Sequence, residues 1–273
     1  MQHALSFDIE DWFHIVDIAE LEEVSTWDER VTIVEEKTDL ILSILGKSST
    51  KATFFVLGWI AEKYPSISKK IVDKGHELGT HSYWHRRVYE LSPKEFYDDL
   101  KRSVDVLENQ TGKKVRGFRA PSFSITPGTE WAFDIMHKVG IEYDASLFPA
   151  KRGHGGYPCE QKAHTIYTRD GELPELPMSV SKLGPIKVPF SGGGYLRALP
   201  LWAIKQGFKK FEKRGIPVVV YLHPRDFAPN QPVVKMPFHR RVKSYTGLSS
   251  TEGKLRSLLK EFNFTTCENI LEI

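Results

Sequence analysis

Residues 32–57, TIVEEKTDLILSILGKSSTKATFFVL, contain a helix pattern followed by a strand pattern. Apolar residues recur at helical spacing from Thr32 to Leu45, and Gly46 marks the expected end of the helix. The run from Ala52 to Leu57 is short, apolar and rich in Phe, which is typical of a buried strand. A helix that leads into a buried strand indicates an α/β fold with a parallel sheet or barrel.

The same alternation continues on both sides of this stretch. Strand patterns are expected at residues 4–8, 76–80, 115–118, 141–143, 217–222 and 263–266. Helix patterns are expected up to Gly75 and over residues 92–109, 126–140, 200–214 and 251–262. The clearest boundary is Ser92-Pro93-Lys94-Glu95, a capping box with proline at the first helical position.

Residues 150–194 break this rhythm because they are rich in Gly and Pro. Short β-like pieces at residues 179–183 and 186–190 indicate surface hairpins or an inserted loop region. The chain has 273 residues, a length that barrels of alternating strands and helices fill as one domain. We therefore expect one domain over residues 1–273.

Composition excludes several classes of protein. With 40% hydrophobic and 12% aromatic residues the chain can form a buried core, so it is neither disordered nor fibrous. A net charge of +3 is too small to indicate a general nucleic-acid binder. Cys159 and Cys267 are widely separated, which argues against a disulfide framework or a cysteine-rich zinc site. No export signal or membrane-spanning run is visible, so we expect a soluble, cytoplasmic protein.

Three carboxylates, Asp8, Glu10 and Asp11, stand at the end of the first expected strand. In parallel α/β architectures the loops after the strands form the active face, so acids there can point into a shared pocket. The alternative is a helix N-terminus that carries acidic residues.

A histidine pair, His81 and His85, also follows an expected strand. Its four-residue spacing puts both imidazoles on one face if the segment is helical or turn-like. Two histidines and one carboxylate form a catalytic zinc set that leaves a coordination position open for water. The bound zinc lowers the pKa of that water to about 7. The alternative is two surface or partly buried histidines.

Two more candidates end expected strands. Arg119, in the segment Gly117 to Phe123, could orient a carboxylate or bind an anionic group. His223 ends the most apolar strand and would emerge at the same edge, although a neutral core histidine is the alternative reading.

In this order, the acids, the histidine pair, Arg119-Ala120-Pro121 and Leu222-His223-Pro224 resemble the motif series of the polysaccharide deacetylases, the NodB-homology or carbohydrate esterase group. The resemblance runs from Leu5 to about His223 and depends on the joint order and spacing of the motifs. It implies a distorted (β/α)7-type barrel with inserted hairpins and loops.

The remaining chain resembles one subgroup of that family, whose members accompany exopolysaccharide and exosortase gene clusters. The similar parts are residues 191–195, SGGGY, and the tail through Phe238, Arg240, Tyr245 and residues 251–264. Residues 225–273 are accordingly expected to be a subgroup-specific C-terminal extension of the single domain.

Transferred residue by residue, the resemblance implies that Asp8 is the general base and that Arg119 tethers it. His223 would be the general acid, and His81 and His85 would bind the metal. Zinc is the expected metal, with Co, Ni and Fe as alternatives.

The third metal ligand is not fixed by the motif. The family has two adjacent aspartates, whereas Asp8 is followed by Ile9, Glu10 and Asp11, so Glu10 is favoured and Asp11 is the alternative. Asp144 stands where the family has an Asp-x-x-Asp-Trp motif, which leaves open whether it supports His223.

Substrate contacts are expected from Trp12, Pro121, Ser122, Phe123 and Tyr195, some of which could stack on sugar rings. A backbone N–H near Ser122 or Phe123 would stabilise the oxyanion. The alternative for the aromatic residues is simple core packing.

The expected activity is metal-dependent removal of N-acetyl groups from an amino sugar of a polysaccharide or of its nucleotide- or lipid-linked precursor. One alternative is hydrolysis of cyclic imides or other small-molecule C–N bonds. Another is a catalytically inactive carbohydrate-binding module on the same fold. No nucleic-acid partner and no transmembrane segment are expected.

Overall fold

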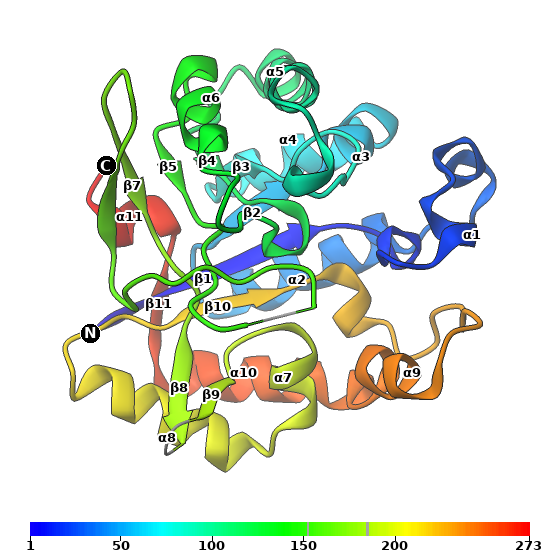
Figure 1. Ribbon diagram of the computed structural model, residues 1–273. Helices are drawn as coiled ribbons and strands as arrows, with labels where there is room; N and C mark the ends of the chain where they lie inside the picture. Colours follow the sequence, from blue (N-terminus) through cyan, green and yellow to red (C-terminus); the bar gives the residue numbers. More distant parts are fainter. Residues whose placement is uncertain (152, 184–185) are drawn as a thin grey trace.

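A sheet of mostly parallel strands forms the centre of the protein (Figure 1). The computed structural model describes residues 1–151, 153–183 and 186–273. Within them the strand order is β10-β1-β2-β3-β4-β5-β7-β6, with β11 also paired to β1. The seven strands from β10 to β7 pair in parallel, as the alternation of helix and strand patterns predicts. The strands of this sheet are β1 (Gln2–Ile9), β2 (Thr53–Val56), β3 (Glu77–Thr80), β4 (Gly117–Phe118), β5 (Tyr143–Asp144), β6 (His164–Tyr167), β7 (Glu172–Glu175), β10 (Val219–Leu222) and β11 (Asn263–Thr265).

Two hairpins lie in the Gly- and Pro-rich region, where the sequence predicts inserted hairpins. Strands β6 and β7 pair antiparallel and end the main sheet. Strands β8 (Val180–Leu183) and β9 (Ile186–Pro189) form a separate antiparallel pair. These pairings interrupt the regular barrel and account for its distortion.

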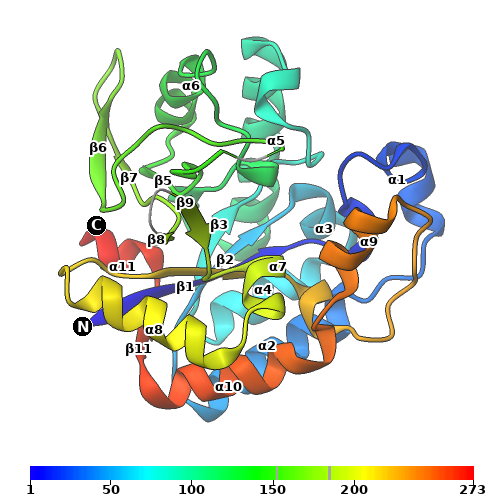
Figure 2. The ribbon, with the colours of Figure 1, turned by 60° about the horizontal axis from the view of Figure 1, so that its bottom comes forward.

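Helices lie around the outside of the curved sheet. Helices α5 and α6 lie at the top of the view, and α8 and α10 lie at the bottom (Figure 2). Helix α5 begins at the predicted capping box, where Ser92 and Glu95 cap each other, and it ends at Gly112, whose φ is 64°. The helices are α1 (Ala19–Glu22), α2 (Val34–Lys47), α3 (Gly58–Lys63), α4 (Pro65–Asp73), α5 (Pro93–Thr111), α6 (Trp131–Val139), α7 (Gly193–Ala198), α8 (Leu201–Glu212), α9 (Phe238–Tyr245), α10 (Thr251–Glu261) and α11 (Cys267–Leu271).

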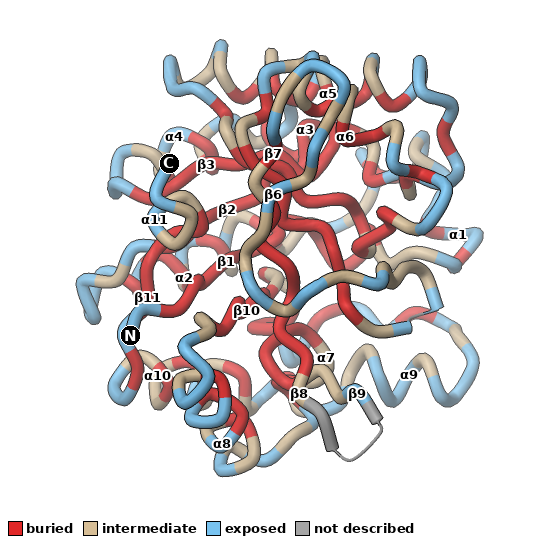
Figure 3. Tube along the Cα trace, turned by 60° about the vertical axis from the view of Figure 1, so that its left-hand side comes forward, coloured by how far each residue is buried: buried red, intermediate tan, exposed pale blue. Residues whose placement is uncertain are grey.

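The first strand shows how the sequence separates the helix-covered face from the barrel interior. Successive side chains of a strand point to opposite faces. The odd-numbered residues from Leu5 to Ile9 join the core between the sheet and the helices. The even-numbered residues from Ala4 to Asp8 are small or polar and face the interior, where Ala4 packs near Phe55 and Tyr221. Buried residues follow the central strands, and exposed residues follow the outer helices (Figure 3).

The amino ends of the strands are closed by polar contacts around Glu77 and helix α11. Thr53 Oγ1 donates to Glu77 Oε2 at 2.5 Å, and Tyr143 donates to the other carboxylate oxygen. The backbone N–H of Cys267, at the start of α11, donates to Thr53 Oγ1 at 2.7 Å. Burial raises the pKa of Glu77 to about 7. Because these contacts and α11 close the amino ends of the strands, the candidate site is expected at the carboxyl ends.

Several expected boundaries were wrong, each for a local reason. Helix α2 continues through Gly46 to Lys47. The helix expected before Gly75 is divided at Pro65, which begins α4 because proline fits the first turn of a helix. Helix α6 begins at Trp131 because Thr129 Oγ1 accepts from the N–H of Thr126 and closes a separate turn.

The glycine run of residues 192–194 lies at the start of a helix. Helix α7 begins at Gly193, and a Cβ at Gly192 would lie 2.1 Å from the ring of Tyr221. Gly192 is therefore needed for close packing rather than for flexibility. Within the described residues, no helix combines the length and the apolar character needed to cross a membrane.

We predict that Gly117→Ala destabilises the fold by about 2 to 3 kcal/mol, because a Cβ at this position would lie 2.2 Å from the ring of Tyr143. Urea unfolding followed by circular dichroism measures the change. Gly253→Ala in α10 is the matched control, since its Cβ meets nothing within 4 Å, and it should be neutral or stabilising by up to about 1 kcal/mol. Equal effects in the two variants would contradict the packing role of Gly117.

Candidate active site

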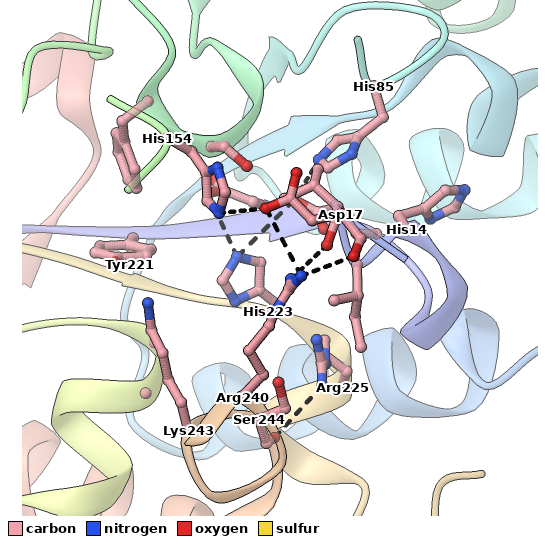
Figure 4. Close-up of a pocket in the computed structure, with 18 of the residues that line it drawn as sticks. His14, Asp17, His85, His154, Tyr221, His223, Arg225, Arg240, Lys243 and Ser244 are labelled. Carbon is pink, nitrogen blue, oxygen red and sulfur yellow. Dashed lines mark hydrogen bonds and ion pairs between the residues drawn. The ribbon is translucent and has the colours of Figure 1, made fainter. Parts of the chain in front are cut away.

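A cavity of about 450 Å³ opens beyond the carboxyl ends of β1, β3 and β10 (Figure 4). Its lining includes Asp8 and Glu10 from the end of β1, His81 and His85 from the loop after β3, and His223 from the end of β10. The parallel sheet brings these ends to the same edge. The cavity thus gathers residues that lie far apart in the sequence.

Asp8 is held by an arginine that is fully buried in the barrel. Arg119 Nη1 donates to Asp8 Oδ1 at 2.8 Å and to Ser6 Oγ at 2.7 Å. Arg119 Nε donates to the carbonyl oxygen of Ala145 at 3.1 Å. These bonds fix one carboxylate oxygen of Asp8, while Oδ2 lies 3.8 Å from His223 Nε2.

Glu10 lies between the two histidines of the loop after β3. Its Oε1 atom is 3.0 Å from His81 Nε2 and 3.0 Å from His85 Nε2. All three residues are buried, and their ligand atoms lie within 4.8 Å of one another. Burial alone would raise the pKa of Glu10, but the charge of His85 and the hydrogen bonds of the two histidines hold it well below its usual range.

The tautomer of His81 indicates that a cation belongs between His81 Nε2 and Glu10 Oε1. His81 Nδ1 lies 2.7 Å from the carbonyl oxygen of Arg119, which can only accept, so Nδ1 must carry a proton. In a neutral ring, the Nε2 lone pair then faces the oxygen of Glu10. A proton or a metal ion must separate two such acceptors, and the buried set of two imidazoles and one carboxylate suits a divalent transition metal.

His223 lies on the other side of Asp8 and has its own carboxylate partner. Its Nδ1 atom is 3.0 Å from Asp226 Oδ2. Asp226 Oδ1 is in turn 2.8 Å from Arg197 Nε. Burial alone would lower the pKa of His223, but the hydrogen bond with Asp226 and the charge of Glu10 raise it to about 9. The Nε2 atom therefore faces the cavity as an acid.

Backbone strain is concentrated around the cavity. Of the seven non-glycine residues with positive φ in the described chain, four line it, namely Asp17, His85, Ser122 and Phe123, with φ between 55° and 58°. Such conformations cost energy and persist where the surroundings enforce them. They turn the loops after β3 and β4 toward the centre of the site.

The structure separates the two candidates for the third ligand. Asp11 is fully buried, and its carboxylate accepts from the N–H of Trp12 at 2.8 Å, from Thr32 and from the N–H of Val34 at 3.2 Å. It anchors the start of α2, where an anion is favoured. Glu10, not Asp11, is brought to the histidine pair.

Only some of the residues expected to touch substrate line the cavity. Ser122, Phe123 and Tyr195 line the cavity. Trp12 does not, because its ring is buried and its Nε1 donates to the carbonyl oxygen of Val31 at 2.9 Å. Pro121 is buried at the start of the turn after β4. Trp12 therefore has the alternative role of core packing.

Asp144 does not reach His223. It is fully buried within the barrel, where Ser146 Oγ donates to its Oδ1 at 2.5 Å, and it pairs in register with Glu175 of the neighbouring strand. Burial raises the pKa of Asp144. The partner of His223 is Asp226, which the sequence reasoning missed although it stands three residues later in the segment HPRD.

The sequence reasoning also missed several charged residues at the cavity mouth. Lys243, which also lines the cavity, lies in the basic stretch from Lys235 to Lys260, for which the sequence suggests either contact with an anionic glycan, nucleotide-sugar or lipid headgroup or a solvated surface. The missed lining residues are His14, Asp17, His154, Arg197 and Arg225.

Two families match successive parts of the chain. Residues 23–143 match the family described as Polysaccharide deacetylase. This region contains His81, His85 and Arg119, whereas Asp8 and Glu10 precede it. Residues 145–272, with His223, match a family described as Domain of unknown function (DUF3473).

The peptidoglycan-N-acetylglucosamine deacetylase of Bacillus cereus is 35% identical over 121 residues, which cover 40% of this chain and 44% of that protein. Matches to relatives from Gibberella zeae and Helicobacter pylori likewise span less than half of those proteins.

Two solved structures share the fold. A polysaccharide deacetylase candidate from Mycobacterium smegmatis aligns with a TM-score of 0.65 at 19% identity, over 98% of this chain and 88% of that one. A CE4 family pseudoenzyme from Bacillus anthracis aligns with a TM-score of 0.53 at 19% identity, over 99% of this chain and 66% of that one. The first alignment confirms the predicted distorted (β/α)7-type barrel.

We predict that Glu10→Ala weakens Zn²⁺ binding by at least about a hundredfold, because it removes the carboxylate between His81 and His85. Asp11→Ala is the control, since it should keep Zn²⁺ affinity while losing about 1 kcal/mol of stability with the α2 anchor. Calorimetric titration of chelated protein with Zn²⁺ and thermal unfolding measure the two effects. Loss of Zn²⁺ binding in Asp11→Ala alone would reverse the assignment.

Proposed function

We propose that this protein is a metal-dependent hydrolase that removes N-acetyl groups from an amino sugar of a polysaccharide or its precursor. One observation carries the proposal: the buried Glu10, His81 and His85 cluster lies beside both a tethered carboxylate and a histidine whose pKa is raised. A sugar-binding module needs none of these groups for ring stacking. The family of residues 23–143 and the activity named for the Bacillus cereus relative support the same reaction.

Glu10, His81 and His85 would hold the metal, with zinc first and Co, Ni or Fe as alternatives. When bound, such an ion lowers the pKa of water and polarises the acetyl carbonyl group. The hydrogen bond of His81 Nδ1 to the Arg119 carbonyl oxygen orients the ring and keeps Nε2 free to ligate.

Asp8 would act as the general base. Arg119 occupies the Oδ1 atom of this residue, so Oδ2 is the oxygen available to take a proton from the attacking water. The ion pair keeps the carboxylate in one orientation, which avoids a cost of reorganisation during the reaction.

His223 would act as the general acid that protonates the leaving nitrogen. An amine leaves poorly unless it is protonated, and the bond to Asp226 keeps His223 charged at neutral pH. For the oxyanion, the N–H of Phe123 is already bonded to the carbonyl oxygen of Ala120 at 2.9 Å, so we assign this role to the N–H of Ser122.

The finer parts of the proposal rest on sequence. The resemblance of residues 191–195 and of the tail to the exopolysaccharide-associated subgroup supports a substrate from such a pathway. A role for residues 225–273 as an extension of the same domain, and action in the cytoplasm, stay predictions.

We predict that chelated protein releases no acetate from N-acetylated sugars and that added Zn²⁺ or Co²⁺ restores release. Asp8→Asn should lower kcat/KM by at least about a hundredfold and still bind metal, because it removes the base and keeps Glu10, His81 and His85. An acetate assay over neutral, nucleotide-linked and oligomeric sugars, with calorimetric metal titration, measures both effects. No release from any sugar by the metal-loaded protein would favour the cyclic-imide or inactive-module alternatives.

We predict that kcat/KM falls as pH rises above neutrality, because His223, whose pKa is raised by its bond to Asp226, then loses the proton that it must donate. Asp226→Asn removes a charge that raises this pKa. The alkaline limb of the profile of kcat/KM against pH should therefore move to lower pH by about one unit or more. Asp144→Asn is the control and should leave the limb in place. An unmoved limb in Asp226→Asn would show that His223 is not the acid.

A further inference from the structure

The cavity mouth carries more positive than negative charge. Its lining has three acidic residues, Asp8, Glu10 and Asp17, and four residues of the Lys and Arg type. Two of the acids are engaged at the centre of the site, where Asp8 pairs with Arg119 and Glu10 lies between the histidines. A divalent ion at Glu10 would add further positive charge.

Asp17, the third acid, neutralises little of the positive charge at the cavity mouth. Asp17 is shared between two arginines and a histidine: it pairs with Arg87, lies 3.6 Å from Arg240 Nη1 and lies 2.8 Å from His154 Nε2. Of the lining cations, Arg197 is matched by Asp226. The Lys and Arg side chains of the lining therefore outnumber its acidic side chains.

Arg225 is the most informative of these residues. It follows His223 by two positions, and its Nε atom is buried without a hydrogen-bond partner among the described residues. Its Nη2 atom makes one long bond, 3.4 Å, to the carbonyl oxygen of Ser244. Within the described chain it has no carboxylate in ion-pair distance, in contrast to Arg119 and Arg197. A half-buried guanidinium with free donors on a cavity wall is suited to a ligand anion.

Helix α9 brings the other two cations to the same wall. Arg240 donates to the carbonyl oxygens of Val16 at 2.5 Å and Asp17 at 2.8 Å, which fixes the helix over the mouth. Lys243 lines the cavity one turn later. Figure 4 shows Arg225, Arg240 and Lys243 grouped below His223, whereas His85 lies above it.

We propose that Arg225, Lys243 and Arg240 form an anion-binding subsite beside His223, and that the protein acts on N-acetylated glycans with a carboxylate or phosphate near the reacting acetamide. This inference rests on the proposed function and specifies its substrate class. The planar guanidinium of Arg225 can bind two oxygens of either anion at once, and Lys243 adds a point charge.

Three probes that share N-acetylglucosamine test the subsite: tetra-N-acetylchitotetraose is neutral, a hyaluronan tetrasaccharide carries carboxylates and UDP-N-acetylglucosamine carries phosphates. Calorimetry measures their binding to the full chain, and an acetate assay runs in parallel. We expect at least one acidic probe to bind about tenfold more tightly than the neutral one, with a preference that weakens in high salt. The tighter of the two acidic probes distinguishes carboxylate from phosphate.

Arg225→Gln and Lys243→Gln should each reduce this preference by about fivefold or more, and Arg225→Lys should keep part of it because the charge remains. Arg241→Gln is the matched control, since Arg241 is exposed on the same helix and does not line the cavity. Lys243→Gln is at an exposed position, so it tests the subsite even if Arg225→Gln does not fold.

Equal affinity of the native protein for all three probes would overturn the subsite. An effect of Arg241→Gln as large as that of Arg225→Gln would also overturn it, because general surface charge would then explain the preference. Failure of the proposed function is a different result: the anion preference would remain while the metal-loaded protein released no acetate from any probe.

Discussion

The buried ion pair of Arg119 and Asp8 holds together the barrel interior and the chemistry at its mouth. Arg119 is fully buried, and its guanidinium binds Asp8, Ser6 and the carbonyl oxygen of Ala145, so it joins β1 to the ends of β4 and β5. Its own carbonyl oxygen accepts from His81 Nδ1. One residue thus sets the orientation of the proposed base and the tautomer of a proposed metal ligand. Removing either partner of such a pair leaves a buried charge and costs about 3 to 5 kcal/mol.

A second set of contacts positions His223, the proposed general acid. Arg197 pairs with Asp226, which binds His223, and it also donates to the carbonyl oxygens of Ser244 and Thr246 at the end of α9. The segment that forms the mouth is therefore tied to the residue that orients His223. Changes in α9 can reach the proposed general acid through this one arginine.

The residues at strand ends were the ones that sequence reasoning could find. Asp8, His81, Arg119 and His223 each follow an apolar run that reads as a strand, and parallel strands bring their carboxyl ends to one edge. Residues in the insertions and the tail could not be found in this way. Arg225 follows His223 by two positions, and no pattern in the sequence marks its side chain as part of the cavity wall. Lys243 reaches the cavity because α9 packs over its mouth.

The sequence by itself determined the α/β class, the parallel order of strands and helices, and the group of residues at the functional edge, because side-chain periodicity and strand ends are local properties. Only the tertiary structure decided which of two candidate acidic residues takes each role in the site. Glu10 and Asp11 are adjacent acids, yet one faces the histidine pair and the other anchors α2, because successive residues after a strand point in different directions. Asp144 and Asp226 are both plausible partners for His223 in sequence, and long-range packing buried the first beside Glu175 and brought the second to the imidazole.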